Sequence, residues 1–398
     1  MTPSRDDRRA VREPRQRRPP ARPSTRRPPP RQPYRRHRSA ALRRRRAAAA
    51  FLSVLIVVVA AALVVPRVLG SPHRHHPPSS IPVASHTSTA HTSTATRTTT
   101  SSTTTHTTTT HAVPHGPFPV AHTTLSIVEP AAASSDPAAG PRQLPTVVRY
   151  PATQAAGPFP LIVFSQGFAE APQVYSALLH AWAAAGFVVA APTYPDTDPD
   201  APGGLDELDM IHHPTDLRYV IGAVVQAASN PASPLHGRLE PGQVAVVGQS
   251  DGGNVSLAVA ANTCCSDPAV RAAVILSGAE WIQFGGQYFA TRAVPLLVVQ
   301  GSNDPINPPA CSALIYDQAP RPKYFLELVG ASHLPPYIDP GADRRGVAEV
   351  VTAFLDSYLK GRRSGLQRLL AKANLGGGVR LSAGATSPIP EGSCPGAP

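Results

Sequence analysis

Short apolar runs alternate with longer amphipathic stretches over residues 118–362. Continuous apolar runs of about four to eight residues are typical of strands buried on both faces, and longer amphipathic stretches are typical of helices. Strands are predicted at residues 160–164, 187–191, 244–248, 270–276, 296–299 and 324–329, and helices at 172–185, 216–228, 254–261 and 346–359. This alternation predicts a mainly parallel, right-handed doubly wound sheet of the α/β class.

Two further strand-like stretches, 123–128 and 144–150, precede this pattern and are separated by a connector rich in Pro, Gly and Ser. They predict a hairpin-like opening to the domain. Past Lys360 the composition shifts to Gly, Ser and Pro, which predicts a low-order C-terminal tail at 363–398 with at most one short basic helix, near 366–373. The globular domain is therefore assigned to residues 118–362.

The first 117 residues follow a different pattern, in three parts. Residues 1–46 are rich in Arg and Pro and almost lack apolar side chains, so we expect them to be disordered. Residues 47–65 carry no charge and a single hydroxyl, which predicts a transmembrane signal-anchor at 47–66. Residues 67–117, dominated by Ser, Thr, His and Pro, are expected to form an extended low-complexity stalk, a composition that is often O-glycosylated.

The positive charge of the chain lies before the apolar segment. Residues 1–46 hold 18 of the 37 basic residues, all of them Arg. This asymmetry predicts a cytoplasmic N-terminus and a globular domain outside the membrane. No convincing cleavage site follows the apolar segment, so a single-pass anchor is preferred, and secretion after cleavage is the alternative.

The formal net charge of +12 is therefore a property of the tail. With three acidic residues, the tail carries a net +15, and the rest of the chain carries −3. We expect no nucleic-acid partner for this mildly acidic remainder. The tail is interpreted as a positive flank that sets membrane orientation and is also attracted to acidic lipid; nucleic-acid binding is the alternative.

Cysteine and histidine positions argue against a metal site. The four cysteines (Cys264, Cys265, Cys311 and Cys394) match no zinc spacing, and in an exported domain they favour one or two disulfides of open connectivity. The eight stalk histidines are too dispersed for one rigid site, so a solvated spacer is preferred to weak metal binding. No metal or organic cofactor is expected.

A reactive serine is predicted where the apolar run at 244–248 ends. Gly248-Gln249-Ser250-Asp251-Gly252 lies between this predicted strand and a predicted helix. A strand that passes through G-x-S-x-G into a helix is the nucleophile elbow, in which the two glycines relieve crowding around a strained serine. An ordinary turn between a strand and a helix is the alternative interpretation.

Two later strand ends supply partners for the serine. Serine becomes a nucleophile when a base removes its proton and an acid orients that base, in the chain order Ser, acid, His. Asp304 follows the predicted strand at 296–299, and His333 follows the last predicted strand. We expect Asp304 to orient His333, with Glu280, just past another strand, as the rival acid.

Backbone N–H groups are expected to form the oxyanion hole. One donor follows the serine and the other follows the first central parallel strand, which points to Asp251 and Phe168. Residues 278–292 are too short for a large lid. They carry Trp281, which we expect to line the substrate cleft, with packing in the core as the alternative.

These motifs together resemble those of α/β-hydrolases over residues 123–359. The chain is most similar to the bacterial esterase branch that includes dienelactone hydrolases, platelet-activating-factor-acetylhydrolase-like enzymes and cutinase-like polyester hydrolases. The turn at 164–168, the elbow at 248–252, the turn at 301–304, His333 and the helix start at 213–217 carry the resemblance. Two departures are Gln249, where histidine is common, and Asp251, where a hydrophobic or small residue is common.

The expected function is a membrane-anchored, extracytoplasmic serine hydrolase of carboxylic esters that acts through an acyl-enzyme. Its substrate would be a small-molecule, lipid or polyester ester. Acyl transfer to a cell-envelope acceptor and a catalytically idle envelope-binding module are the alternatives. The sequence leaves acyl-chain length and oligomeric state open.

Overall fold

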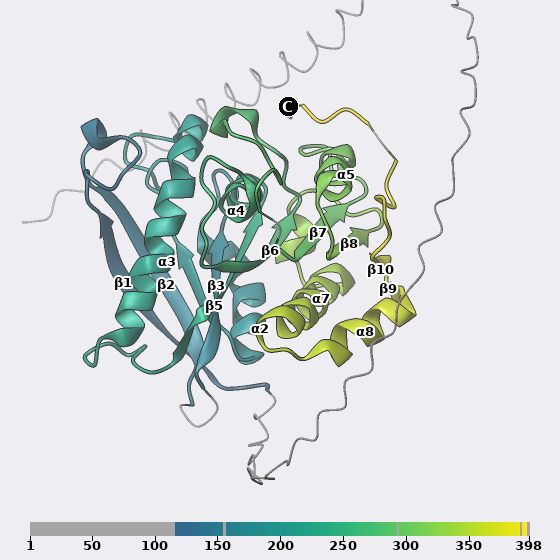
Figure 1. Ribbon diagram of the computed structural model, residues 1–398, viewed down its shortest axis with the longest axis horizontal. Helices are drawn as coiled ribbons and strands as arrows, with labels where there is room; N and C mark the ends of the chain where they lie inside the picture. Colours follow the sequence, from purple (N-terminus) through teal and green to yellow (C-terminus); the bar gives the residue numbers. More distant parts are fainter. Residues whose placement is uncertain (1–115, 154–156, 293, 391, 396–398) are drawn as a thin grey trace, which may run out of the picture. The chain divides into compact units, whose positions relative to one another are not determined.

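The computed structural model describes residues 116–153, 157–292, 294–390 and 392–395, which fold around one ten-stranded sheet (Figure 1). The predicted cytoplasmic tail and signal-anchor, and the stalk up to residue 115, lie outside the described residues. Within the described ranges, no helix combines the length and apolar character needed to cross a membrane.

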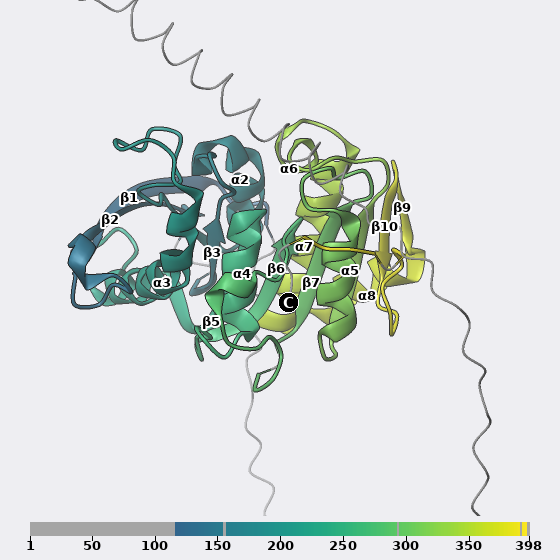
Figure 2. The same cartoon turned by 90° about the horizontal axis from the view of Figure 1, so that it is seen from above.

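The sheet is mixed, with a parallel centre. Its order is β1-β2-β4-β3-β5-β6-β7-β8-β10-β9. The strands are β1 Val120–Glu129, β2 Arg142–Pro151, β3 Phe159–Ser165, β4 Val188–Pro192, β5 Leu239–Gln249, β6 Val270–Leu276, β7 Leu296–Gly301, β8 Lys323–Leu328, β9 Asn374–Gly376 and β10 Val379–Ser382. Neighbours from β4 to β8 pair in parallel, whereas β1, β2, β9 and β10 pair antiparallel. Figure 2 shows these antiparallel strands at the two ends of the sheet.

Helices cover both faces of the sheet (Figures 1 and 2). One face packs against α3 His213–Ser229, α4 Asp251–Ala261 and α5 Pro309–Gln318, and the other against α2 Ser176–Ala184, α7 Ala342–Leu359 and α8 Arg363–Lys372. The short elements are α6 Pro335–Ile338 and the 3-10 turns η1 Pro137–Ala139, η2 Pro172–Tyr175, η3 Glu207–His212 and η4 Ile282–Phe284. This arrangement is consistent with the predicted α/β-hydrolase fold.

The strand β3 shows why the central strands are apolar throughout. Leu161 and Val163 belong to the hydrophobic cluster with α3 and α4, while Ile162 and Phe164 belong to the cluster with α2 and α7. Successive side chains of a strand point to opposite faces, so a strand covered on both faces needs an uninterrupted apolar run. The six predicted runs all correspond to strands.

The helix boundaries differ from the predictions where proline occurs. The helix predicted at 172–185 is divided into η2 and α2, and the helix predicted from 216 begins at His213, with Pro214 in its first turn. Proline is favoured in the first turn because its missing N–H has no helical partner there. Helix α5 was not predicted; it also begins with proline, directly after Pro308.

The C-terminal segment is more ordered than predicted, so low order over 363–398 is wrong for residues 363–382. Helix α8 starts three residues before the short basic helix predicted near 366–373 and overlaps it up to Lys372. After it, β9 and β10 form a hairpin, and Leu381 of β10 pairs with Leu326 of β8. Val379 and Leu381 are buried. Burial of these two side chains against α7 and β8 extends the sheet beyond the expected boundary.

The cysteines form two disulfides, Cys264–Cys265 and Cys311–Cys394. The second joins α5 to the C-terminal segment and holds Pro395 at the wall of a hollow described below. In the described part of the chain, no cluster of three or more His, Cys, Asp or Glu residues is placed to hold a metal ion.

Candidate active site

The predicted site residues lie past the carboxyl ends of neighbouring parallel strands. Strand β3 pairs with β4 on one side and β5 on the other, so the chain order of the sheet changes direction there. Ligands of open α/β sheets bind at such a switch point. Ser250 follows β5, Asp304 follows β7 and His333 follows β8.

Ser250 has a strained backbone, with φ 55° and ψ −123°. A β carbon at Gly248 would overlap the carbonyl oxygen of Gly252, and one at Gly252 would overlap that of Ser165. Only glycine therefore allows β5, α4 and the turn after β3 to approach one another this closely. This geometry matches the nucleophile elbow expected from G-x-S-x-G.

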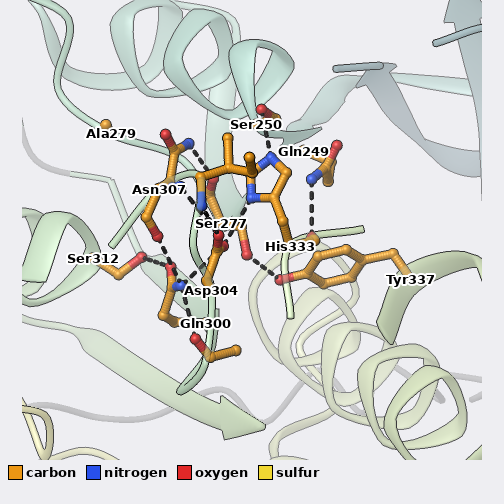
Figure 3. A network of polar contacts seen from close by, with 12 residues as sticks. Gln249, Ser250, Ser277, Ala279, Gln300, Asp304, Asn307, Ser312, His333 and Tyr337 are labelled. Atoms are coloured by element: carbon orange, nitrogen blue, oxygen red, sulfur yellow. Dashed lines mark hydrogen bonds and ion pairs between the residues drawn. The ribbon is translucent and has the colours of Figure 1, made fainter. Parts of the chain in front are cut away.

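Three predicted side chains are in contact in one chain of polar groups (Figure 3). The Nε2 atom of His333 lies 2.8 Å from Oγ of Ser250. The Nδ1 atom of His333 lies 2.8 Å from Oδ2 of Asp304. The imidazole thus touches the serine through one nitrogen and the carboxylate through the other, which is the arrangement needed for proton transfer from a serine hydroxyl.

Asp304 is held in its charged form. Burial alone would raise its pKa, but the hydrogen bond with His333, the charge of that ring and the amides of Ile306 and Asn307 together lower the pKa below its ordinary value. These amides donate to Oδ1 of Asp304 at 2.9 and 3.0 Å. Oδ2 is left to accept from His333 and from Nε2 of Gln300 at 3.1 Å.

Several residues that hold this site were not predicted from the sequence. Ser312 donates to Oε1 of Gln300 at 2.7 Å, and Asn307 Nδ2 donates to the carbonyl of Ser277 at 2.7 Å (Figure 3). Gln300 is fully buried at the end of β7. A single polar residue that ends an apolar strand run was the available signal, because a buried amide requires hydrogen-bond partners.

Gln249 connects the elbow to the histidine loop. Its Nε2 donates to the backbone carbonyl of His333 at 3.2 Å, and its Oε1 accepts from the hydroxyl of Tyr175 at 2.7 Å. The residue that replaces the common histidine therefore links β5, η2 and the loop after β8.

The turn after β3 lies against the elbow. A β carbon at Gly167 would lie 3.2 Å from Cβ of Ser250. No group in the described ranges accepts a hydrogen bond from the amides of Phe168 or Asp251. Unpartnered N–H groups next to a nucleophile are the feature that an oxyanion hole requires.

A hollow of about 570 Å³ opens beside the elbow. Phe168, Asp251, Glu280 and Trp281 all line it. Trp281 is half-buried, and its ring packs edge-on against Phe284 with centroids 4.7 Å apart. Asp304 contacts His333, whereas Glu280, the rival acid, lies in the wall of this hollow.

Five exposed aliphatic side chains lie at the hollow or next to its lining residues in the sequence, and we call them the apolar rim. Its members are 45% to 64% exposed, and each lines the hollow or neighbours a lining residue in sequence: Leu205, Leu208, Ile211, Ile282 and Ile306. Exposed clusters of large apolar residues mark binding surfaces more often than single ones do. The rim therefore suits an apolar partner or substrate.

A buried ion network holds the η3 side of the rim. Arg142 of β2 contacts both carboxylate oxygens of Asp209 at 2.8 and 2.7 Å, and both of Asp216 at 2.8 Å. His213 Nε2 lies 3.1 Å from Oδ2 of Asp209. The hydrogen bonds with His213 and Arg142 lower the pKa of Asp209 against the opposing effect of burial. This network joins β2, η3 and α3, and the sequence did not reveal it.

We expect the substitution Asp251→Asn to change how stability depends on pH. Burial, and after it the charge of Glu207, raises the pKa of Asp251 from 3.8 to about 7. Between these values the folded protein keeps a proton that the unfolded chain releases, so the free energy of unfolding falls as pH rises. The variant removes this loss of stability, which is on the order of 1–3 kcal/mol. The difference between its melting temperature and that of the wild type should therefore increase by several degrees from pH 4 to pH 8.

Calorimetry at constant ionic strength measures this shift. Asp200→Asn, at an exposed carboxyl, is the control and should show the same difference from the wild type at both pH values. An Asp251→Asn difference that does not change with pH would contradict a raised pKa.

Comparison with known proteins agrees with the predicted resemblance. The family model PETase, described as PET hydrolase-like, matches residues 103–363, which is more than half of the chain. No curated protein matches the chain. The match covers the elbow, Asp304 and His333, and agrees with the α/β arrangement of the sheet. The chain therefore belongs to the PETase family, a polyester hydrolase family of the α/β-hydrolase superfamily.

Proposed function

We propose that this chain is a serine hydrolase that cleaves carboxylic esters through an acyl-enzyme intermediate. The observation that carries the proposal is the contact of His333 with both Ser250 and Asp304. Membership of the PET hydrolase-like family supports ester hydrolysis in general.

In the first half of the reaction, Oγ of Ser250 attacks the ester carbonyl carbon while Nε2 of His333 takes the hydroxyl proton. Asp304 stabilises the resulting imidazolium and keeps the ring oriented. The amides of Phe168 and Asp251 stabilise the oxyanion. His333 then gives its proton to the leaving alcohol, which departs and leaves Ser250 acylated.

In the second half, water attacks the acyl carbon and His333 takes a proton from that water. The second oxyanion uses the same two amides. The bond to Oγ breaks, His333 returns the proton to Ser250, and the carboxylic acid leaves. These reaction steps need no metal or organic cofactor, because the imidazole of His333 carries each proton.

The apolar rim supports a substrate whose ester is carried by an apolar surface, such as a polyester or a lipid aggregate. Trp281 is proposed to contact the part of the substrate next to the reacting ester. The hydropathy of residues 47–66 supports anchorage in the cell membrane. The 18 arginines before this segment support a catalytic site on the extracytoplasmic side.

Hydrolysis of p-nitrophenyl esters by the full chain in detergent, from acetate to longer acyl groups, tests the proposal. A fluorophosphonate probe should also label the chain, with the modified peptide containing Ser250. Labelling without hydrolysis of any ester would favour acyl transfer to an envelope acceptor. A folded chain that shows neither would favour a catalytically idle binding module.

A further inference from the structure

The hollow beside Ser250 is rich in carboxyl groups. Four acidic residues line it: Asp206, Glu207, Asp251 and Glu280. No Lys, Arg or His is among the described residues that form its wall. A hollow with one sign of charge and low-dielectric walls concentrates ligands of the opposite charge.

Two of these carboxyls each have one buried oxygen without a hydrogen-bond partner, although the carboxyl of Glu280 also has a side-chain hydrogen bond with Gln318. Glu280 is 1% exposed, and no described group forms a hydrogen bond with its Oε1. Oδ2 of Asp251 is likewise buried and unpartnered. A buried acceptor that lacks a partner costs folding free energy, so such groups in a binding hollow indicate a ligand that donates to them or carries positive charge.

A positive charge suits this hollow better than a neutral hydrogen-bond donor. Asp251 is the residue whose amide is proposed to stabilise the oxyanion, so its ionised side chain would place two negative charges close together during the reaction. Burial raises the pKa of Asp251 and of Glu280 to about 7 each, which makes both groups available as anions in mildly alkaline solution. A bound cation would balance the negative charge of the carboxylates and would also stabilise the oxyanion.

Aromatic rings complete the chemistry of the hollow. Trp281 and Phe168 line it together with the carboxyls. Organic cations bind well between aromatic faces and carboxylates, because the ring face carries partial negative charge and the alkyl groups of the cation bury apolar surface. Inorganic cations would instead seek several oxygen ligands, and the described residues form no such cluster.

We propose that this hollow is a subsite for an organic cation, such as a quaternary ammonium or protonated amine, that is covalently part of the ester substrate. The assignment rests on the proposed ester hydrolysis and adds a charge class to the substrate. Glu280 and Asp251 contact the cation, Trp281 packs on it, and Glu207 contributes longer-range attraction. The apolar rim then accommodates the rest of the substrate.

Pairs of esters that differ only in charge test the subsite. For a cationic alcohol, butyrylcholine is compared with 3,3-dimethylbutyl butyrate; for a cationic acyl group, the p-nitrophenyl ester of 4-(trimethylammonio)butyrate is compared with that of 5,5-dimethylhexanoate. At pH 8 the wild-type full chain should show kcat/KM at least about tenfold higher for the cationic member of one pair. High salt should reduce this ratio.

Substitutions locate the effect. Glu280→Gln should bring the ratio of the favoured pair close to one. Glu207→Gln, at an exposed residue that tolerates substitution, should lower it several-fold. Glu240→Gln is the matched control, because Glu240 lines a separate hollow with Phe118 and Lys360, and the ratio should not change. Equal kcat/KM within both pairs, or a preference that survives Glu280→Gln, would overturn the subsite.

A binding measurement separates this inference from the proposed function. The Ser250→Ala variant is titrated calorimetrically with butyrylcholine and with 4-(trimethylammonio)butyrate methyl ester, so no turnover is needed. At least one of these two esters should bind to Ser250→Ala. Its affinity should be at least about tenfold lower for the double variant that also carries Glu280→Gln. If neither ester binds, or if Glu280→Gln leaves the affinity unchanged, the subsite is refuted even if neutral esters are hydrolysed. Absence of hydrolysis of every ester refutes the proposed function, while charge-dependent binding would still support the subsite.

Discussion

The substitution Ser250→Ala is expected to lower kcat for p-nitrophenyl butyrate by about 10⁴-fold or more, with a much smaller change in KM. The alanine side chain provides no oxygen to attack the ester, and His333 then has no hydroxyl within reach (Figure 3). The residual rate should come from binding and the oxyanion amides alone, since these groups are unchanged. Stopped assays with high enzyme concentration measure such a rate.

Ser256→Ala is the matched control for this variant. Ser256 lies in α4, directly after the elbow, is fully buried and has a hydroxyl without a described partner, so its removal changes a serine near Ser250 without touching His333. We expect it to keep activity within a few-fold of the wild type. Melting curves for both variants exclude unfolding as the cause of a loss. Near-normal hydrolysis by a folded Ser250→Ala variant would refute the acyl-enzyme mechanism at this site.

The substitution Asp304→Asn is expected to lower kcat by about 10³- to 10⁴-fold. The carboxylate accepts from Nδ1 of His333, which leaves Nε2 free to take the serine proton. An amide at this position can donate to Nδ1 instead, which places the ring proton on Nε2, and it stabilises no imidazolium. The pH dependence of kcat should change as well, since the charge beside the ring is lost.

The comparison with Glu280→Gln distinguishes the two acids that the sequence offered. Because Asp304 contacts His333 and Glu280 lies in the wall of the hollow, we expect the loss with a neutral ester to be at least about 100-fold larger for Asp304→Asn. A larger loss in the Glu280 variant, with Asp304→Asn close to wild type, would reverse the assignment.

Much of the fold could be predicted because local patterns report burial directly. The run at residues 160–164 is apolar on both alternating faces, and the structure places it between two layers of helices. The elbow could be recognised because its requirement is local: two glycines must allow close approach of backbone around Ser250. Its partners could be proposed because parallel strands bring their carboxyl ends to one edge, so residues after β7 and β8 must lie near those after β5.

The remaining features depend on contacts between distant segments. Leu381 and Val379 form a strand because β8 offers an unpaired edge. The composition of their own segment, by contrast, predicts low order. The pairing of Cys311 with Cys394 depends in the same way on where α5 and the C-terminal segment meet. Neither contact leaves a periodic signal in the sequence around these residues.

The sequence by itself determined the alternation of elements, the strained serine and the order of its partners, because each follows from side-chain periodicity or from the needs of a single turn. Only the tertiary structure decided that Asp304, not Glu280, contacts His333, that Gln249 and Gln300 support the site, and that Glu280 and Asp251 share one acidic hollow. The physical reason is that hydrogen bonds and burial act over about 3 Å, and the distances between strand ends are set by the packing of the whole sheet.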